Sequence, residues 1–326
     1  MSATGDRPAP VRVDPLAVRR ALREAGTRPK KGLSQNFLVD TEVLDAILAE
    51  AAPTERRRVL EVGPGLGVLT GALIDAGAAV VAVELDAALA RRLRGAYAGA
   101  IARRAQDPEG PRTLRLEEGS ILDIEIDTVI APPFDVVANL PYHITSPVLH
   151  RLLGEAPRPD RCVLMVQREV AERIAAPPGR MSYLSVFVQY HATARVARVV
   201  PPTAFEPAPA VDSAILVLDV RPDDDPRRLD PAVEDDLWRL VQAAFRERRK
   251  MIHNVLVRQL PAPPDRVATA LAAAGIAPDR RPQTLAVEEW LALRAALGPL
   301  AADRRGRRAA ELAAFDDAGD DGEHDA

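Results

Sequence analysis

Short apolar runs alternate along the first 220 residues with longer segments whose apolar positions recur at the spacing of one helix face. The runs predict buried strands at 58–62, 78–83, 114–116, 134–138, 162–166, 194–200 and 214–220. The segments between them predict helices, the clearest at 14–22, after Thr41, after Gly67, up to Leu93, and at 146–153, 169–174 and 183–190. Strands and helices in alternation indicate the α/β class, with a doubly wound sheet and right-handed crossovers.

Two regions depart from this alternation. Residues 100–111 contain proline and glycine and predict a surface loop, and the Pro/Asp-rich stretch 222–231 predicts a linker. Beyond the linker, only helices are expected: one runs to Phe245 and continues through the basic segment 246–250 toward Leu256. Two further helices are expected near 264–274 and 287–297. This part of the chain is therefore predicted to be a small all-α domain.

These patterns divide the chain into four parts. They are a partly disordered N-terminal extension at 1–27, an α/β domain at 28–221, a helical domain at 230–300 and a tail at 303–326. The last eleven residues carry six acidic side chains, which predicts that the tail is solvated and disordered. Asp14 is expected to cap the first helix, and Thr41 is expected to cap the helix that ends before Pro53.

A glycine-rich turn follows the first predicted strand of the α/β domain. In Glu61–Gly67 every second residue from position 63 is glycine, which lets a ligand approach the backbone beside the free N–H groups of the next helix. Val68 replaces the third glycine of a dinucleotide-binding turn, so a nicotinamide oxidoreductase is disfavoured and a smaller nucleoside ligand is expected. The next strand ends at Glu84, 21 positions after Gly63, where such folds place the carboxylate that holds a ribose. Asp86 is the nearby alternative.

The stretch Val136–Tyr142 runs from a predicted strand into residues that do not favour a strand. Pro141 has no N–H to donate, and it biases Leu140 toward an extended backbone. Asn139 offers an amide that can donate and accept, and Tyr142 offers a flat face, so together they could hold a nucleobase. An ordinary strand end with a turn is the alternative. Four features fall at carboxyl ends of strands, where doubly wound sheets bind ligands: Gly63–Gly67, Glu84, Ser120 and Asn139–Tyr142.

Charge and composition narrow the function further. The formal net charge is −4, but six negative charges lie in the last eleven residues, so the rest of the chain stands at +2. Arg248, Arg249 and Lys250 form a basic run that is either a solvated face or a phosphate-binding surface. No apolar run reaches the roughly 18–20 residues of a membrane helix, so no membrane association is expected. The lone Cys162 indicates a cytoplasmic setting, and the five histidines show no metal-ligand spacing.

Taken together, these motifs resemble the bacterial small-subunit rRNA adenine dimethyltransferase family over about residues 28–298. The stretches that carry the resemblance are Lys31–Asp40, Val59–Thr70, Asn139–Pro147, Met165–Ile174, Phe205–Ala214 and Phe245–Leu256. The resemblance implies a Rossmann-like methyltransferase sheet with S-adenosylmethionine as cofactor. It also implies methyl transfer to N6 of two adjacent adenosines in the 3′-terminal hairpin of 16S rRNA, on free RNA or on an assembling small ribosomal subunit, by a monomer.

The same resemblance assigns roles to individual residues. The cofactor would be held by Asn36, Leu38, Gly63, Gly65, Glu84, Ser120 and Asn139. The target base would be handled by Asn139, Leu140, Pro141, Tyr142 and Phe205, with Tyr142 stacked on one face of the base and Phe205 covering the other. RNA would be bound by Lys30, Lys31, Arg248, Arg249 and Lys250.

Two residues depart from the family's usual pattern. Ser120 stands where the family usually has an aspartate that accepts from the adenine amine, and a hydroxyl accepts more weakly than a carboxylate. Asp123 or Glu118 could compensate for the missing carboxylate. Ser34 replaces the family's usual glycine before Gln35.

Three alternatives remain. One is an antibiotic-resistance type of large-subunit rRNA methyltransferase, which shares the Leu-Ser-Gln-Asn-Phe-Leu motif at 33–38. The longer helical region, with Phe245–Leu256 and Arg281–Trp290, favours a small-subunit substrate over this alternative. A DNA adenine methyltransferase is disfavoured because nothing resembles a DNA target-recognition domain. A non-catalytic ribosome assembly factor on the same scaffold is disfavoured by the intact Asn139–Tyr142 and Glu61–Gly67 motifs.

Overall fold

The computed structural model describes residues 8–300. The disorder predicted for the acidic tail and for the first seven residues therefore lies outside the described residues. The described chain forms two compact units. The first comprises the residues up to Ala171 together with Arg195–Val220, and the second comprises Glu172–Ala194 together with the residues from Arg221 onward.

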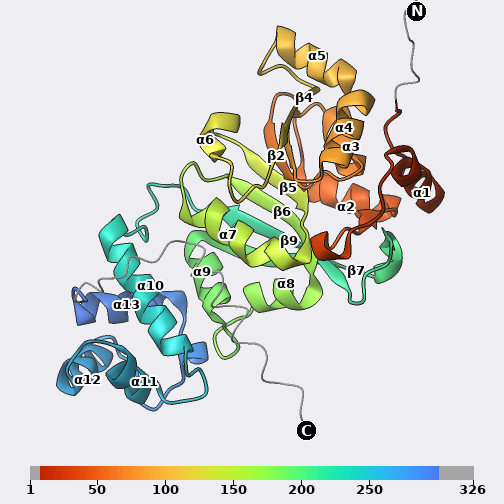
Figure 1. Cartoon of the computed structure of the whole chain (residues 1–326). Coiled ribbons are helices and arrows are strands. Elements are labelled where there is room, and N and C mark those ends of the chain that lie inside the picture. The colour runs from red at the N-terminus through yellow and green to blue at the C-terminus, as the bar shows by residue number, and fades with distance from the viewer. Residues whose placement is uncertain (1–7, 301–326) are drawn as a thin grey trace, which may run out of the picture. The chain divides into compact units, whose positions relative to one another are not determined.

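Helices and strands follow one another along the chain largely as predicted (Figure 1). The strands are β1 (Phe37–Leu38), β2 (Arg58–Val62), β3 (Ala79–Glu84), β4 (Thr113–Glu118), β5 (Asp135–Asn139), β6 (Arg161–Gln167), β7 (Ala192–Val200), β8 (Phe205–Glu206) and β9 (Ser213–Val220). The α-helices are α1 (Pro15–Glu24), α2 (Thr41–Ala51), α3 (Val68–Asp75), α4 (Ala87–Ala96), α5 (Ala98–Gln106), α6 (Ile126–Val129), α7 (Thr145–Gly154), α8 (Arg168–Ile174), α9 (Tyr183–His191), α10 (Pro231–Phe245), α11 (Ile252–Gln259), α12 (Pro264–Ala273) and α13 (Val287–Leu297). Short 3₁₀ turns occur at η1 (Lys31–Leu33), η2 (Tyr142–Ile144), η3 (Pro202–Ala204) and η4 (Pro282–Thr284).

The main sheet has seven strands in the order β4-β3-β2-β5-β6-β9-β7. β2, β3, β4, β5 and β6 pair in parallel, and β9 pairs antiparallel to β6. After β2 the chain builds the sheet outward through β3 and β4, and it then returns to place β5 on the other side of β2. This reversal creates a topological switch point between β2 and β5, where such sheets bind their ligands. The arrangement confirms the predicted doubly wound α/β class.

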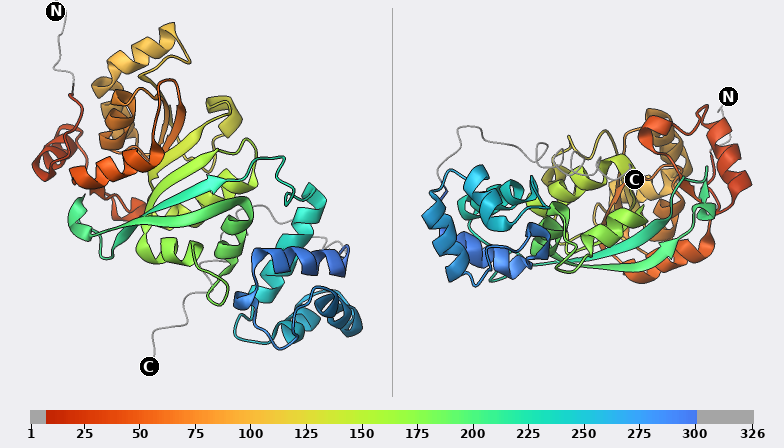
Figure 2. Two further views of the ribbon diagram at one scale, coloured as in Figure 1. Left: turned by 180° about the vertical axis from the view of Figure 1, so that it is seen from behind. Right: turned by 90° about the horizontal axis from the view of Figure 1, so that it is seen from below.

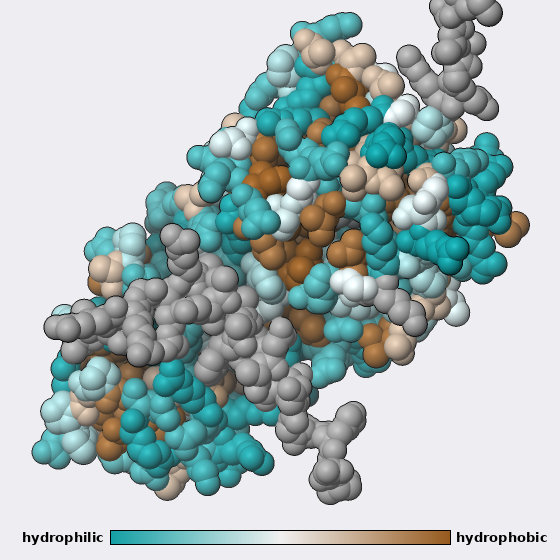
Figure 3. Space-filling model, in the orientation of Figure 1, coloured by the Kyte–Doolittle hydropathy of each residue, from teal (hydrophilic) through white to brown (hydrophobic). Residues whose placement is uncertain are grey.

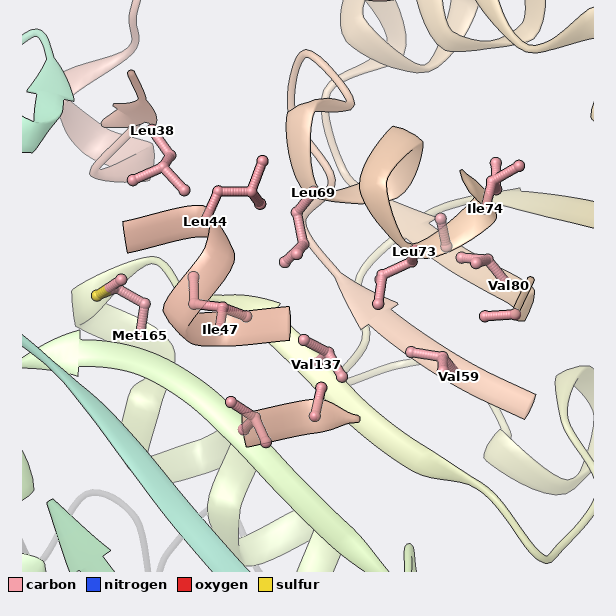
Figure 4. Close-up of a cluster of buried hydrophobic side chains, with 14 of the residues drawn as sticks. Leu38, Leu44, Ile47, Val59, Leu69, Leu73, Ile74, Val80, Val137 and Met165 are labelled. Carbon is pink, nitrogen blue, oxygen red and sulfur yellow. The ribbon is translucent and has the colours of Figure 1, made fainter. Parts of the chain in front are cut away.

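Both faces of the sheet are covered. Val136, Val137 and Ala138 of β5 are each at most 1% exposed, as expected for a central strand of a parallel sheet between helix layers. Figure 4 shows part of one layer of the core, in which Ile47 of α2 and Leu73 of α3 lie over the sheet. Helices on both sides of the sheet thus hold the carboxyl ends of its strands in fixed positions.

A second, two-stranded sheet joins distant parts of the first unit. β1 pairs antiparallel with β8, so that Phe37 lies opposite Glu206 and Leu38 opposite Phe205. Two of the sequence motifs, about 170 residues apart, are therefore neighbours in space. Helix α1 packs beside them, because its buried residues Val18, Ala21 and Leu22 join one cluster with Phe37, Leu66 and Leu89.

The second unit is built around α9 to α13, and Figure 2 shows α10 to α13, coloured cyan to blue, gathered into one bundle. Aromatic rings explain why Glu172–Ala194 groups with these helices. The rings of Tyr183, Phe187 and Tyr190 on α9 have centroids 6.3, 5.0 and 5.2 Å from that of Trp238 on α10. The compact units therefore depart from the continuous ranges 28–221 and 230–300, which had placed α9 in the α/β domain.

Three local predictions were wrong. Residues 98–106 form α5 and not a loop, because alanine and arginine predominate from Ala100 to Gln106 and the helix ends before Pro108 and Gly110. Asp40, and not Thr41, caps α2, and its carboxylate accepts from the N–H of Val43 at 3.1 Å. The helix ending at Phe245 does not continue: residues 246–250 form turns, and α11 begins at Ile252. Asp14 does cap α1, as predicted, by accepting from the N–H groups of Leu16 and Ala17.

Candidate active site

A cavity of about 140 Å³ opens at the switch point of the sheet. Its walls come from the carboxyl ends of β2, β3, β4 and β5 and from the segment around β1. Every residue predicted to hold the cofactor lies on its lining: Asn36, Leu38, Gly63, Gly65, Glu84, Ser120 and Asn139. Leu140, Pro141 and Tyr142 also lie on the lining. Residues spread over more than a hundred positions are thus brought to one place.

Glu84 and the glycine-rich turn are tied together. One Glu84 oxygen accepts from the N–H of Gly65 at 2.9 Å, and the other accepts from the N–H of Asp86 at 2.8 Å. Burial raises the pKa of Glu84, and these two hydrogen bonds oppose the rise. Gly65 has a φ of +60°, and a side chain there would meet the Phe37 ring at 3.0 Å. The turn therefore requires glycine at this position, for conformation as well as for space.

A second acid, Glu61, faces the same cavity. It is 1% exposed, and its Oε2 has no hydrogen-bond partner among the described residues. Burial raises the pKa of Glu61 to about 8, Thr70 opposes this rise, and the nearby Glu84 adds to it. A buried carboxylate with one unpartnered oxygen on a cavity wall is suited to a cationic ligand, which would satisfy that oxygen and favour the ionised form.

The segment before β1 fixes the orientation of Asn139. The Asn139 Nδ2 donates to the backbone carbonyl of Asn36 at 2.9 Å. A carbonyl can only accept, so this contact decides which end of the amide is the NH₂. The Asn139 Oδ1 is left as a free acceptor on the cavity wall, since no hydrogen bond within residues 8–300 reaches it. Asn36 is itself anchored, because its Nδ2 donates to the Ser34 carbonyl at 3.2 Å.

Ser34 adds a further contact between the same two segments. Its hydroxyl lies 3.2 Å from the Nδ1 of His143, which follows the Asn139–Tyr142 motif. Ser34 has a φ of +46°, a left-handed conformation that disfavours non-glycine residues. The side chain that replaces the usual glycine thus finds a hydrogen-bond partner of its own.

Leu140 and Tyr142 complete the wall opposite the glycine-rich turn. Leu140 is 1% exposed, and its N–H donates to the Met165 carbonyl at 3.1 Å. Its own carbonyl accepts no hydrogen bond from the described residues. The Tyr142 hydroxyl lies 2.7 Å from the hydroxyl of Ser213, which is fully buried at the start of β9. Burial raises the pKa of Tyr142, so its hydroxyl stays protonated. The ring is therefore held at both ends, by its backbone and by Ser213.

Phe205 does not lie where it was predicted to cover a face of the target base. It pairs with Leu38 across the small sheet, is 3% exposed and belongs to the main core cluster. It does not lie on the lining of the cavity. In this conformation, therefore, Phe205 offers no exposed face to a base, and only Tyr142 of the predicted pair can stack on one.

The region around Ser120 lacks a substitute carboxylate. The Ser120 hydroxyl accepts from the N–H of Leu122 at 3.1 Å and lines the cavity. Glu118 pairs with Arg94 at 3.0 Å, and Asp123 is exposed. Neither lies on the cavity lining, so the expectation that Asp123 or Glu118 compensates for Ser120 is not supported.

The predicted RNA-binding residues have different surroundings. The Lys30 ammonium pairs with Asp86 at 2.8 Å, and the side chain of Asp86 is 1% exposed. Burial alone would raise the pKa of Asp86, but hydrogen bonds from Lys30, the Ala88 N–H and Gln35 outweigh it and lower the pKa. Asp86 is therefore engaged and does not compete with Glu84 for a ligand. In the second unit, the basic cluster of Arg248, Arg249 and Lys250 is exposed. These residues lie in the turns between the end of α10 and the start of α11.

Three residues of the site were given no individual role from the sequence. Leu85 is apolar yet 55% exposed on the cavity lining, where it can cover one face of a flat ligand. The sequence feature that could have indicated Leu85 is its position as an apolar residue between Glu84 and Asp86 at the end of a strand. Glu61 was noted only as the start of the Glu61–Gly67 motif and Ser213 only within the Phe205–Ala214 stretch, because their individual roles depend on burial and on partners distant in the sequence.

Among residues 8–300, no group of three or more His, Cys, Asp or Glu side chains is arranged to hold a metal ion. Within the same range, no helix is both long and apolar enough to cross a lipid bilayer.

Comparison with known proteins extends the resemblance over most of the chain. A family model described as ribosomal RNA adenine dimethylase matches residues 26–297. A protein of Anaeromyxobacter sp. (strain K), named ribosomal RNA small subunit methyltransferase A, is 43% identical over 86% of this chain and 97% of its own length. A protein of the same name from Geobacter sulfurreducens is 40% identical over 83% of this chain and 96% of its own.

Solved structures give the same result. The 23S rRNA methyltransferase ErmE superposes with a TM-score of 0.60 and 30% identity, covering 80% of this chain and 99% of its own. A dimethyladenosine transferase from Plasmodium falciparum gives a TM-score of 0.64 and 25% identity, covering 79% of this chain and 95% of its own. The fold, the cavity and these relatives agree with the resemblance drawn from the sequence motifs. The chain belongs to the ribosomal RNA adenine dimethylase family.

Proposed function

We propose that this chain transfers methyl groups from S-adenosylmethionine to N6 of two adjacent adenosines in the 3′-terminal hairpin of 16S rRNA. The observation that carries the proposal is the oriented amide of Asn139, whose Nδ2 is held by the Asn36 carbonyl. It leaves two acceptors next to each other in the sequence, the Asn139 Oδ1 and the Leu140 carbonyl. Two acceptors side by side match the two N–H groups of an adenine N6 amine.

The cavity fits the proposed cofactor. S-adenosylmethionine, when bound, supplies a methyl group on a sulfonium, which is already activated toward a nucleophile. Glu61 and Glu84 provide two buried carboxylates for a ligand with cationic and hydroxyl groups, and the orphaned Oε2 of Glu61 is the clearest sign of a missing partner. Leu85 would pack on the adenine ring, and Ser120 would accept from its amine, more weakly than an aspartate.

The chemistry then needs a better nucleophile and correct placement. The N6 lone pair of adenine is delocalised into the ring, which makes the amine a poor nucleophile. Hydrogen bonds from N6–H to the Asn139 oxygen and the Leu140 carbonyl favour a pyramidal nitrogen whose lone pair is available. Tyr142 stacks on the extruded base and keeps it in line, a contribution of roughly 1–3 kcal/mol for one base. Placement of this kind lowers the barrier without a strong general base.

The RNA substrate is proposed from the named relatives and from charge. Relatives named as small-subunit methyltransferases are similar over nearly their whole length. The basic cluster at 248–250 is exposed, and it is proposed to contact RNA phosphates. The alternative is a large-subunit substrate, because the structurally similar ErmE is named a 23S rRNA methyltransferase.

Transfer of tritiated methyl groups to purified ribosomal subunits tests the proposal. Small and large subunits that lack their own methylations would be supplied separately, with S-adenosylmethionine as the donor. Incorporation of about four methyl groups per small subunit, as N6,N6-dimethyladenosine, is expected, because two adenosines each take two. Labelling of the large subunit alone would establish the alternative, and labelling of neither would overturn the assignment of this chain as an active rRNA methyltransferase.

A further inference from the structure

A broad groove lies along helix α1, apart from the active-site cavity. It has a volume of about 1310 Å³ and is lined by α1, by residues 8–12 and by one face of α4 from Ala88 to Gly95. Six guanidinium groups line it, from Arg12, Arg19, Arg20, Arg23, Arg91 and Arg92, against the two carboxylates of Asp14 and Glu24. Figure 3 shows that the surface over α1, at the right of the view, is largely hydrophilic. The groove is thus a basic surface and not an apolar one.

The two acids are already engaged within the first unit. Asp14 accepts from the first N–H groups of α1 and so compensates the positive end of that helix. Glu24 lies 3.6 Å from Arg20 and 4.0 Å from Arg92. Outside the groove lining, Glu206 pairs with Arg19 at 3.0 Å.

Three arginines remain without an acidic partner. Arg12, Arg23 and Arg91 are all exposed, and none forms an ion pair within residues 8–300. Several unpaired guanidinium groups along one groove repel one another, and this repulsion is relieved by a polyanion that bridges them. A single small anion could satisfy only part of such a long surface.

Helix α1 connects the groove to the active site. Its buried face, Val18, Ala21 and Leu22, packs against Phe37 and Leu89, which also line the active-site cavity. Its opposite face carries Arg19, Arg20 and Arg23. The groove also reaches Ala21 on the buried face, so it lies within about one helix diameter, roughly 10–12 Å, of the wall of the cavity. An RNA hairpin whose base enters the cavity is wide enough to cover both.

We propose that this groove binds the phosphate backbone of the RNA whose adenosine is methylated. The inference rests on the proposed function, and it adds a contact surface on α1 and α4 to the cluster at 248–250. The planar guanidinium forks match phosphate oxygens. Apolar contact is minor, because Leu16 is the only large apolar side chain highly exposed in the groove among the described residues, which argues against a membrane or an apolar protein partner.

The salt dependence of RNA binding tests this inference. The test variant is Arg23→Gln with Arg91→Gln, and the control is Arg56→Gln with Arg112→Gln. The control arginines are also exposed, and they precede β2 and β4 at the sheet edge opposite the cavity. Both variants lose two positive charges, so a general charge effect would change them equally. Binding of a 16S rRNA 3′-hairpin would be measured at several salt concentrations.

The groove variant is expected to lower the slope of log K against log salt by about 1.4–1.8, with binding weakened by about tenfold or more near 0.1 M salt. The control should keep the slope of the parent. Equal slopes for both variants would overturn the inference while leaving the proposed function intact. If the parent protein itself neither binds nor methylates the hairpin or the small subunit, the proposed function fails instead. Unchanged binding of S-adenosylhomocysteine confirms that the site is intact.

Discussion

Glu61 makes cofactor binding depend on a proton. With a pKa of about 8, its carboxyl is about nine-tenths protonated at pH 7 in the free protein. A cationic ligand beside it favours the carboxylate, so the proton must leave as the ligand binds. We expect release of about 0.9 proton per cofactor at pH 7 and about half a proton at pH 8. Affinity should rise almost tenfold per pH unit below pH 8, and this rise should end near pH 8.

Titration calorimetry in buffers of different ionisation enthalpy measures this proton directly. The perturbation is Glu61→Gln, which resembles the neutral acid and has no proton to release. The control is Glu118→Gln, which removes an exposed carboxylate that lies off the cavity lining. S-adenosylhomocysteine, which keeps the ammonium and lacks the sulfonium charge, shows which cation Glu61 meets: equal proton release with both ligands identifies the ammonium.

Two results would refute this reasoning. One is proton release near zero at pH 7 in the parent protein. The other is release of the same size in Glu61→Gln. Folding supplies an independent check with a definite sign, because a raised carboxyl pKa means that the folded state favours the proton. The stability from Glu61 is complete below pH 4.5 and is lost as the pH rises through about 8, so Glu61→Gln should melt higher than the parent at pH 8.5.

Three further predictions concern the rest of the site. Asn139→Ala should lower methyl transfer at least a hundredfold, while the affinities for cofactor and RNA stay within about threefold of the parent. The control Asn254→Ala, at an exposed position, should change neither methyl transfer nor these affinities. Retained turnover in Asn139→Ala would exclude the role given to Asn139. Ser213→Ala should reduce kcat by about tenfold with little change in KM, because it removes the partner of the Tyr142 hydroxyl. In a Tyr142→Phe background the same substitution should have no further effect on kcat. Additive losses in the double variant would show that the 2.7 Å contact does not matter for turnover. Ser120→Asp should tighten S-adenosylhomocysteine binding about fivefold by calorimetry, and weaker binding would show that the adenine amine does not point there.

Much of this architecture follows from local pattern. β2, β3 and β5 were predicted because buried parallel strands leave continuous apolar runs, and these three runs end at residues that line the cavity. Helix α5 was missed because a proline and a glycine just beyond its end outweighed a run of alanines and arginines within it. The helix break after Phe245 was missed because the basic residues that follow have good helix propensity.

The site was only partly predictable, for a different reason. The positions of Glu84 and Asn139 follow from their places at strand ends, since topology alone brings such ends together. The burial of Phe205 depends on its pairing with Leu38 across a sheet of two short strands, and nothing local in either segment indicates that pairing. The Tyr142–Ser213 contact likewise joins residues 71 positions apart. Tertiary partners of this kind are visible only in the folded chain.

The hydrogen bond that orients Asn139 is accepted by the main-chain carbonyl at position 36, and this determines which mutations the bond tolerates. No replacement of the side chain at position 36 can delete a main-chain oxygen. The orientation of the amide is therefore insensitive to most point changes in this segment. It is sensitive to changes in chain length, because one residue inserted or removed between Ser34 and Phe37 would move the carbonyl by more than the length of a hydrogen bond. Among related proteins, we therefore expect substitutions in this segment to be far more frequent than insertions or deletions.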